Sequence, residues 1–296
     1  MRTQQATIKK SISVSGVGLH TGVSTTVTFH PATANHWFVF KRVDLDGQPL
    51  IKVDADNVAD TARGTTLQMN GAKISTTEHV LAALIGLQID NILIEVDGPE
   101  VPIMDGSSKP FVDALLEAGI EIQDAARDIF VLEDILSYEE PSRNVEMLAV
   151  PSPDYRITVM VDYNSPVLGT QHAQLHKIDE FQDNISPCRT FVFVHELEML
   201  VKHNLIKGGD LNNAIVVVDR EISQDKLDDL AKLLNKPNVQ VKEKGFLNNT
   251  ALHFQNEPAR HKLLDIIGDL ALIGQPIQGH ILAARPGHAA NVELAK

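Results

Sequence analysis

The sequence predicts an α+β protein made of two similar units, on three observations. Stretches of alternating apolar residues bounded by Gly, Pro or Asn predict strands, and apolar stretches of helical period predict helices. In each half of the chain, a predicted helix is followed within a few residues by an apolar strand. The tetrapeptide Ala-Leu-Ile-Gly closes both helices, at residues 83–86 and 271–274. We therefore expect two α+β units packed face to face, with a binding cleft between them.

The predicted elements alternate between strands and helices along the whole chain. In order, we expect strands at 7–22, 23–32 and 36–49, a helix at 75–87, a strand at 91–98, a helix at 109–119, strands at 128–140, 145–150 and 155–163, a helix at 195–204, a strand at 213–219, a helix at 260–274 and a strand at 279–285. The polar stretch 121–128 is the best candidate for a boundary. It divides the chain into an N-terminal α+β domain, residues 1–126, and a C-terminal α+β domain, residues 127–296.

Composition narrows the classes of partner and of site. The 296 residues carry a formal net charge of −13, which disfavours nucleic acid and anionic membranes as partners. No apolar run approaches the roughly 18 residues that span a bilayer, so we expect no stable membrane insertion. Cys188 is the single cysteine, which suits a reducing cytoplasm and leaves His, Asp and Glu as metal ligands. A small anionic substrate is compatible with a pocket lined by a few Lys or Arg.

A polar stripe runs through the predicted helix 260–274. His261, Asp265 and Asp269 recur four residues apart among apolar neighbours, so they share one face of the helix. Burying such groups unpaired costs several kcal/mol, so they must pair, bind an ion or line a cavity. His261 with Asp265 offers two ligands to one ion, and hydrolytic zinc sites typically use three protein ligands. The alternative is an intrahelical His–Asp hydrogen bond or a solvated face.

The pair Glu78-His79, at the start of the helix 75–87, is the leading candidate to complete such a site. His79 would be the third ligand and Glu78 the base that acts on water, an arrangement usual in metal-assisted hydrolysis. The alternative is a capping box, Ser75 to Glu78, with Glu78 at the third helical position and His79 on the surface.

Three further side chains are candidates from their settings. His288 follows a glycine in an expected loop after a strand, and loops carry more than their share of function. Thr190 lies on a turn before an apolar run, where its hydroxyl either stabilises a transition-state oxygen or caps a helix. Cys188 beside it is expected to pack, and His20, in the turn GVGLHTG, is expected to reach a pocket.

Together these segments resemble the zinc-dependent UDP-3-O-acyl-N-acetylglucosamine deacetylases of Gram-negative lipid A biosynthesis. The resemblance follows the family's order over nearly the whole chain, in GVGLHTG, ISTTEHVLAALIGLQIDNILIEVDGPEVPIMDGSS, CRTFVF, KGGDLNNAIVV, RHKLLDIIGDL and GHAAN. It implies two α+β domains whose helix layers are sandwiched between two sheets, with the active site at the domain junction. It also implies hydrolysis of the 2-acetamido group of a UDP-3-O-(3-hydroxyacyl)-N-acetylglucosamine, the committed step of that pathway, by a cytoplasmic enzyme.

The resemblance implies roles for individual residues by position. The zinc ligands would be His79, His261 and Asp265; the general base Glu78; the oxyanion-stabilising residue Thr190; the histidine that protonates the departing amine His288, supported by Asp269; and a substrate-contacting lysine Lys262. The family's passage for the acyl chain would be lined by Phe191, Val194 and Leu197. For Leu197 the alternative is a plain core position.

Two rival functions are compatible with the same residues. One is a different zinc amidase, and the other a non-catalytic protein that binds sugar nucleotides or lipid precursors. A matched acid and base argue against the second, because binding alone needs neither. Some members of the family are fused to a hydroxyacyl-carrier-protein dehydratase. The chain is shorter at its C-terminus than we expect, so such a domain could be missing from it.

Overall fold

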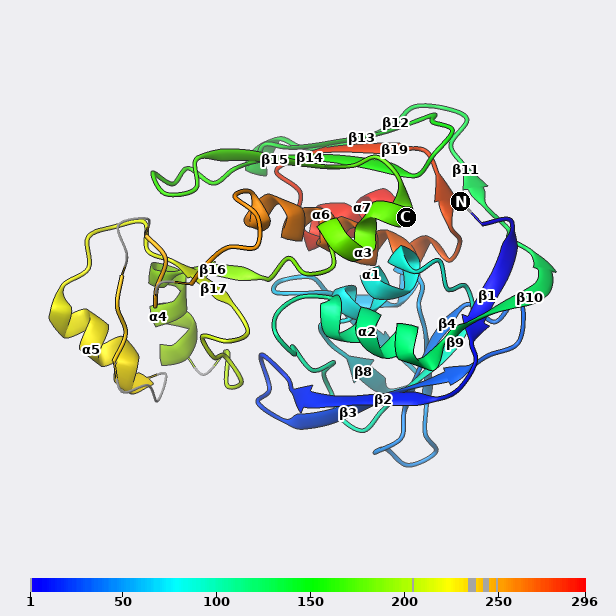
Figure 1. Cartoon of the computed structure of the whole chain (residues 1–296), viewed down its shortest axis with the longest axis horizontal. Coiled ribbons are helices and arrows are strands. Elements are labelled where there is room, and N and C mark those ends of the chain that lie inside the picture. Colours follow the sequence, from blue (N-terminus) through cyan, green and yellow to red (C-terminus); the bar gives the residue numbers. More distant parts are fainter. Residues whose placement is uncertain (1, 204, 234–237, 242–244, 249) are drawn as a thin grey trace.

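Two five-stranded sheets with the same strand order form the outer layers of the molecule (Figure 1). The structure, a computed structural model, describes residues 2–203, 205–233, 238–241, 245–248 and 250–296. From edge to edge, the first sheet comprises β2 (Ile12–Val17), β3 (Ser24–Pro31), β9 (Ile92–Val96), β4 (Phe38–Arg42) and β5 (Leu50–Lys52). The second comprises β12 (Leu136–Glu140), β13 (Val145–Val150), β19 (His280–Ala284), β14 (Arg156–Asp162) and β15 (Thr170–Leu175).

The pairing directions also agree between the two sheets. In each, the last strand in sequence lies in the middle, antiparallel to the second strand and parallel to the third. Burial alternates along strands such as β3 and β13, because successive side chains point to opposite faces. Each sheet therefore has one covered face and one that is solvated.

Helices fill the space between the two covered faces (Figure 1). They are α1 (Glu78–Gly86), α2 (Lys109–Ala118), α3 (Phe181–Asn184), α6 (Glu257–Leu270) and α7 (His288–Ala295). In each half one helix precedes the central strand, α1 before β9 and α6 before β19, and one follows it, α2 and α7. The helices α1 and α6 pack on each other, and one apolar core extends through both halves.

Gly268 allows the close approach of α6 to α1. A Cβ atom at this position would lie 2.1 Å from the backbone oxygen of Glu78, far inside van der Waals contact. A glycine in the middle of a helix costs roughly 1 kcal/mol relative to alanine. Here it brings the first turn of α1 against the polar stripe of α6.

Each half has an insertion between its fourth sheet strand and the helix that follows. The N-terminal insertion, residues 53–77, contains the small sheet of β6 (Val58–Asp60), β7 (Thr66–Met69) and β8 (Ala72–Ile74). The C-terminal insertion, residues 176–256, contains α3 and then β16 (Phe191–Phe193), α4 (Val194–Lys202), β17 (Ile215–Val217) and α5 (Gln224–Leu233). The part from β16 to α5 projects from the sandwich and has a small core of its own (Figure 1).

Each half also has a short two-stranded sheet of its own. β1 (Gln4–Ile8) pairs antiparallel with β10 (Ile120–Ala126), and β11 (Phe130–Val131) pairs parallel with β18 (Ile277–Gln278). Short 3-10 turns occur at Ala55–Asn57, Pro141–Arg143, Ile178–Glu180 and Ala271–Ile273. Among the helices of the described residues, none is long and apolar enough to span a bilayer.

The predicted α+β class, with helix layers between two sheets, is confirmed, and several local expectations need correction. Most of the stretch 121–128 is the paired strand β10, and the division into domains 1–126 and 127–296 stays a prediction. The expected strand at 128–140 is two strands, β11 and β12. The expected helix at 195–204 is α4, and Asn204 lies outside the described residues. Residues 288–295, expected to begin as a loop, form α7 from His288 onward.

Candidate active site

Three side chains of the metal-ligand type meet between α1 and α6. His79 lies in the first turn of α1, and His261 and Asp265 lie one turn apart on α6. Their ligand atoms are all within 4.8 Å of one another, and all three residues are buried. The two imidazole rings stand edge to face with 5.1 Å between their centroids. Two imidazoles with one carboxylate suit a first-row transition metal or zinc.

The protonation of the two imidazoles fits a bound cation. His261 Nδ1 lies 3.0 Å from the backbone oxygen of Cys188, so Nδ1 carries the proton and Nε2 presents its lone pair. His79 Nδ1 is buried and has no hydrogen-bond partner among the described residues, a costly state that an ion would relieve. Burial and the neighbouring His261 lower the pKa of His79 to about 3, and burial lowers the pKa of His261. Both rings are therefore neutral near pH 7, as metal binding requires.

The carboxylate of Asp265 is paired with the Lys262 cation and lies close to the His261 ring. Lys262 Nζ lies 2.9 Å from its Oδ2 atom, and His261 Nε2 lies 3.4 Å from its Oδ1 atom. Burial opposes ionisation, but Lys262 and His261 hold the pKa of Asp265 well below its usual range. Burial also opposes the Lys262 cation, and Asp265 outweighs it and raises the pKa of Lys262. Lys262 therefore presents a positive charge beside the ring of Phe191, 5.7 Å from the ring centroid.

Glu78 is the first residue of α1, and its carboxylate does not close a capping box. Thr77 precedes the helix without a side-chain cap, and Glu78 Oε2 accepts a hydrogen bond from the backbone N–H of Thr65 at 2.9 Å. The alternative, a capping box with Glu78 at the third helical position and His79 on the surface, is therefore wrong, because Glu78 is the first helical residue and His79 is buried. Burial raises the pKa of Glu78 to about 7, with the His288 cation opposing the shift and Asp269 adding to it. A carboxylate with this pKa exchanges protons near neutrality.

His288 begins α7 and is paired with the last carboxylate of the polar stripe. Its Nδ1 atom lies 2.9 Å from Asp269 Oδ2, and its Nε2 atom lies 4.0 Å from Asp265 Oδ2. Burial opposes the cation, but Asp269 and Asp265 outweigh it and raise the pKa of His288 to about 10. The imidazolium form therefore persists at neutral pH. The loop expected here is the N-terminus of a helix, because Gly287 is extended and helical geometry starts at the next residue.

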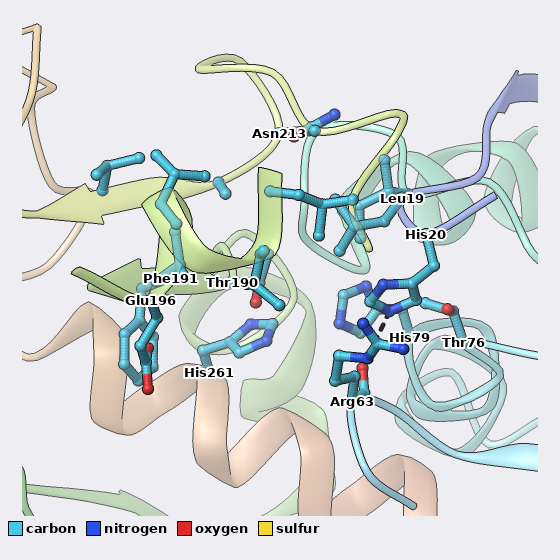
Figure 2. A pocket seen from close by; sticks show the side chains of 18 of the residues that line it. Leu19, His20, Arg63, Thr76, His79, Thr190, Phe191, Glu196, Asn213 and His261 are labelled. Atoms are coloured by element: carbon cyan, nitrogen blue, oxygen red, sulfur yellow. Dashed lines mark hydrogen bonds between the residues drawn. The ribbon is translucent and has the colours of Figure 1, made fainter. Parts of the chain in front are cut away.

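A cavity of about 320 Å³ opens onto these groups. Glu78, His79, Thr190, His261, Lys262, Asp265 and His288 all line it, and Figure 2 shows His79, Thr190 and His261 around the same space. Thr190 is fixed by its backbone, which donates to the Gly106 oxygen at 2.8 Å and accepts from the Ile215 N–H at 2.8 Å. Gly106 has a positive φ of 85°, and a Cβ atom there would lie 2.2 Å from the oxygen of Asn213.

The C-terminal insertion supplies the apolar wall of the cavity. Phe191 at the start of β16 and Leu197 on α4 line it, and their role in an acyl passage stays a prediction. Val194 and Leu197 are both buried in the small core of the insertion, and Val194 lies outside the cavity lining. Of the three side chains expected to form one surface, the structure therefore brings two to the cavity.

The turn that carries His20 is held to the site by a buried carboxylate that the sequence did not single out. Glu100 accepts hydrogen bonds from the backbone N–H groups of His20 and Thr21 and from the hydroxyl of Thr76. Thr76 has a φ of 58°, a conformation that L-residues rarely adopt and that these contacts maintain. His20 lines the cavity as expected, and its Nε2 atom lies 3.1 Å from the backbone oxygen of Arg63 (Figure 2).

Comparison with known proteins gives a consistent match over the chain. The family model described as UDP-3-O-acyl N-acetylglycosamine deacetylase (LpxC) matches residues 5–232 and 230–296. A bifunctional enzyme LpxC/FabZ of Chlorobaculum tepidum is 48% identical over 299 residues, which cover 100% of this chain and 64% of that protein. A bifunctional enzyme of the same name from Bacteroides thetaiotaomicron is 46% identical, over 99% of this chain and 64% of that protein.

The match covers a larger share of a shorter relative. The UDP-3-O-acyl-N-acetylglucosamine deacetylase of Myxococcus xanthus is 38% identical over 293 residues, which cover 99% of this chain and 85% of that protein. The chain thus spans about two thirds or less of the bifunctional relatives and most of this one.

Proposed function

Because this chain belongs to the UDP-3-O-acyl N-acetylglycosamine deacetylase family, we propose that it hydrolyses the 2-acetamido group of a UDP-3-O-(3-hydroxyacyl)-N-acetylglucosamine, in lipid A biosynthesis. The products are acetate and the free 2-amine. The observation that carries the proposal is one cavity lined by three groups of side chains. They are the metal-type cluster of His79, His261 and Asp265, the Glu78 carboxylate with a pKa of about 7, and the His288 imidazolium with a pKa of about 10. A base and an acid beside one metal site are what amide hydrolysis requires.

We assign the metal site to His79, His261 and Asp265, and propose zinc as its occupant. The two neutral imidazoles and the ionised carboxylate support this assignment, as does His79 Nδ1, which has no hydrogen-bond partner among the described residues. When bound, the metal supplies Lewis-acid chemistry, which polarises the amide carbonyl and favours ionisation of water. Three protein ligands leave a position open, as in catalytic rather than structural zinc sites.

Glu78 acts as the general base. The N–H of Thr65 fixes one of its carboxylate oxygens, so the other is available to take a proton from the attacking water. Its raised pKa keeps the proton affinity high enough for transfer near neutral pH. Thr190 stabilises the negative charge that develops on the carbonyl oxygen. Its place on the cavity wall, beside His79, His261 and Asp265, supports this role.

His288 protonates the departing nitrogen. Asp269 holds its Nδ1 proton, so the Nε2 proton is the one available to the leaving amine. The resulting C–N cleavage leaves the amine neutral and returns His288 to its imidazole form. Lys262, whose charge is maintained by Asp265, contacts the anionic part of the substrate. The apolar wall with Phe191 and Leu197 holds the acyl chain.

Acetate release by the metal-loaded protein tests the function directly. We expect release from the acylated UDP-sugar, loss of that release in Glu78→Gln, and unchanged release in Glu117→Gln, a matched change on the exposed side of α2. Equal rates on free N-acetylglucosamine would instead identify a different amidase. Binding of the UDP-sugar without any release would identify a non-catalytic binding protein.

We also propose the cellular setting and a second domain. The single cysteine supports a cytoplasmic location. The bifunctional relatives support a fused hydroxyacyl-carrier-protein dehydratase in the whole protein. Intact-mass measurement of the protein isolated from its native source tests the fusion, and a mass near 32.5 kDa would exclude it.

A further inference from the structure

Thr65, in the N-terminal insertion, uses all of its polar groups at the candidate active site. The residue is fully buried, one position before β7. Its N–H donates to Glu78 Oε2 at 2.9 Å, and its hydroxyl donates to Asp269 Oδ1 at 2.5 Å. Its carbonyl oxygen accepts from the N–H and the hydroxyl of Thr77, at 3.2 and 3.0 Å. One residue therefore joins the start of α1 to the end of the polar stripe on α6.

The backbone around Thr65 is shaped to the Glu78 carboxylate. Gly64 is buried with a φ of 145°, a region that favours glycine. A Cβ atom at Gly64 would lie 2.8 Å from Glu78 Oε1. The segment thus donates a hydrogen bond to one oxygen of the carboxylate and leaves room for the other.

The hydroxyl of Thr65 completes the shell around Asp269. Asp269 Oδ2 accepts from His288 Nδ1 at 2.9 Å and from Asn291 Nδ2 at 2.8 Å, and Oδ1 accepts from Thr65. Asp269 is fully buried, so an oxygen without a donor would be costly and the carboxylate would turn to find one. Because the same carboxylate holds His288, such a turn moves the imidazole.

We propose that Thr65 is a positioning residue that holds the base Glu78 and the Asp269–His288 pair in one fixed arrangement. Its N–H orients Glu78 directly, and its hydroxyl acts on His288 through Asp269. The inference rests on the proposed function, because it assigns Thr65 to the deacetylation reaction. It implies that loss of the hydroxyl lowers kcat and leaves substrate binding intact.

A pair of near-isosteric substitutions isolates the hydroxyl. Thr65→Val keeps the shape and the backbone N–H and removes the donor, whereas Thr65→Ser keeps the donor. We expect Thr65→Val to lower kcat about 10- to 100-fold with KM within about twofold, and Thr65→Ser to stay within about threefold of the wild type. Thr66→Val is the matched control, because the Thr66 hydroxyl bonds to Ser75 instead. Equal kcat values for Thr65→Val and the wild type would overturn the proposal.

A double-mutant cycle separates positioning from general loosening of the fold. If the hydroxyl acts through Asp269, Thr65→Val has little further effect on kcat in an Asp269→Asn background. The same fold-loss in both backgrounds would show that Thr65 acts independently of Asp269. Urea unfolding of each variant confirms that the folded fraction is the same in every assay.

A spectroscopic measurement keeps the inference testable without turnover. The imidazole ¹H–¹⁵N signal of His288 reports its hydrogen bond to Asp269. We expect Thr65→Val to shift this signal, and Thr65→Ser and Thr66→Val to leave it unchanged. Absence of acetate release from the wild type would refute the proposed function, whereas an unshifted signal in Thr65→Val would refute the positioning role alone.

Discussion

The two halves of the chain build the same sheet but place chemistry on it differently. In residues 2–126 and in residues 127–296, a helix precedes the central strand, and these helices, α1 and α6, pack on each other. In α1 the polar groups are confined to the first turn, Glu78 and His79. In α6 they continue along the helix, with His261, Asp265 and Asp269 on one stripe.

The difference follows from what surrounds each helix. After its first turn, α1 is enclosed by the apolar core, so a charge there would have no partner. The carboxylates in the polar stripe of α6 have partners. Asp265 pairs with Lys262, and Asp269 accepts hydrogen bonds from Thr65, His288 and Asn291. A duplicated frame therefore brings two helices together, and their neighbours decide how much polar chemistry each helix can carry.

The insertions differ in the same way. The N-terminal insertion contains a small sheet, and Gly64 and Thr65, between β6 and β7, lie against the Glu78 carboxylate. The C-terminal insertion is a helix-rich unit with its own core, and its Phe191 and Leu197 form the apolar wall of the cavity. The first bonds to Glu78 and Asp269, which we propose take part in the reaction, and the second lines the cavity that we propose holds the substrate.

The largest expected effect tests whether the two helices build one metal site. We expect His79→Ala, on α1, and His261→Ala, on α6, each to lose bound metal and to lower acetate release to background, because two ligands do not hold the ion in place. Metal content after dialysis, measured by mass spectrometry, checks this. His30→Ala is the control, since His30 bonds to Ser11 and Glu95 on the outer face of the first sheet. Full metal retention in either ligand variant would show that the helices do not share a site.

The next effect concerns the C-terminal insertion. Leu197→Trp places a larger side chain on the cavity wall, so the longest acyl chains should be excluded first. At roughly 0.8 kcal/mol per buried methylene, loss of two or three methylene contacts lowers kcat/KM for long chains about 10- to 100-fold and spares short ones. A series of substrates of increasing acyl length measures the shift.

The control for Leu197→Trp is Leu227→Trp. Leu227, on α5, belongs to the same small core but lies away from the cavity wall. It should destabilise the insertion without changing the preferred length. An unchanged length preference in Leu197→Trp would remove Leu197 from the passage.

A smaller effect separates packing from catalysis at two helix glycines. A Cβ atom at Gly86, the last residue of α1, would lie 2.0 Å from the Phe181 ring, and one at Gly268 of α6 would lie 2.1 Å from the Glu78 backbone oxygen. We expect both alanine variants to lose about 1–3 kcal/mol of unfolding free energy through overpacking. Gly268→Ala should also lower kcat roughly tenfold, because it displaces the base.

Urea unfolding and steady-state kinetics on both glycine variants distinguish the two effects. Gly86→Ala serves as the comparison for Gly268→Ala, since its clash is with a side chain remote from Glu78. A kcat for Gly268→Ala equal to that of Gly86→Ala would mean that the α1–α6 contact does not set the position of Glu78.

Sequence reasoning singled out the groups that we propose to react and missed the groups that hold them. Family membership and the α+β sandwich are confirmed, and the stripe of α6 was visible because charges at helical spacing inside an apolar segment have few explanations. Thr65 and Glu100 carry no such pattern. Thr65 bonds to Glu78, 13 residues away in sequence, and to Asp269, 204 residues away; Glu100 bonds to His20, 80 residues away. Local periodicity does not encode contacts at these separations.

The misplaced elements have local causes. Ser75 to Glu78 fits the capping-box motif in sequence, but no capping box forms. The Glu78 carboxylate accepts a hydrogen bond from the N–H of Thr65 instead. Val194 was expected on the passage because its segment, residues 191–206, aligns with the part of the family that builds the passage. The structure buries both Val194 and Leu197 in the small core of the insertion, and of the two only Leu197 also lines the cavity. Which of them reaches the cavity depends on the fold of that insertion.

The smallest expected effect is on the pH profile of kcat/KM, in which we expect each half of the chain to set one limb. Glu78, from α1, must be deprotonated to act, so kcat/KM falls as the pH drops below its pKa, raised to about 7 by burial. His288, from α7, must be protonated, so kcat/KM falls above its pKa of about 10, where Asp269 and Asp265 outweigh burial. Each limb has a slope of at most tenfold per pH unit. A bound cation favours the carboxylate and disfavours the imidazolium, so both limbs of the metal-loaded enzyme lie at lower pH than these values.

Asp269→Asn then separates the halves. It removes the anion that favours the His288 cation, so the alkaline limb should move further down in pH than the acid limb, on which Asp269 acts more weakly than burial does. Profiles of kcat/KM from pH 5 to 10.5 for the wild type and this variant provide the measurement. A wild-type profile that is flat from pH 5 to 9 would count against the acid–base pair. If Asp269→Asn moved both limbs by the same number of pH units, Glu78 and His288 would titrate as one coupled pair and neither limb would belong to one half.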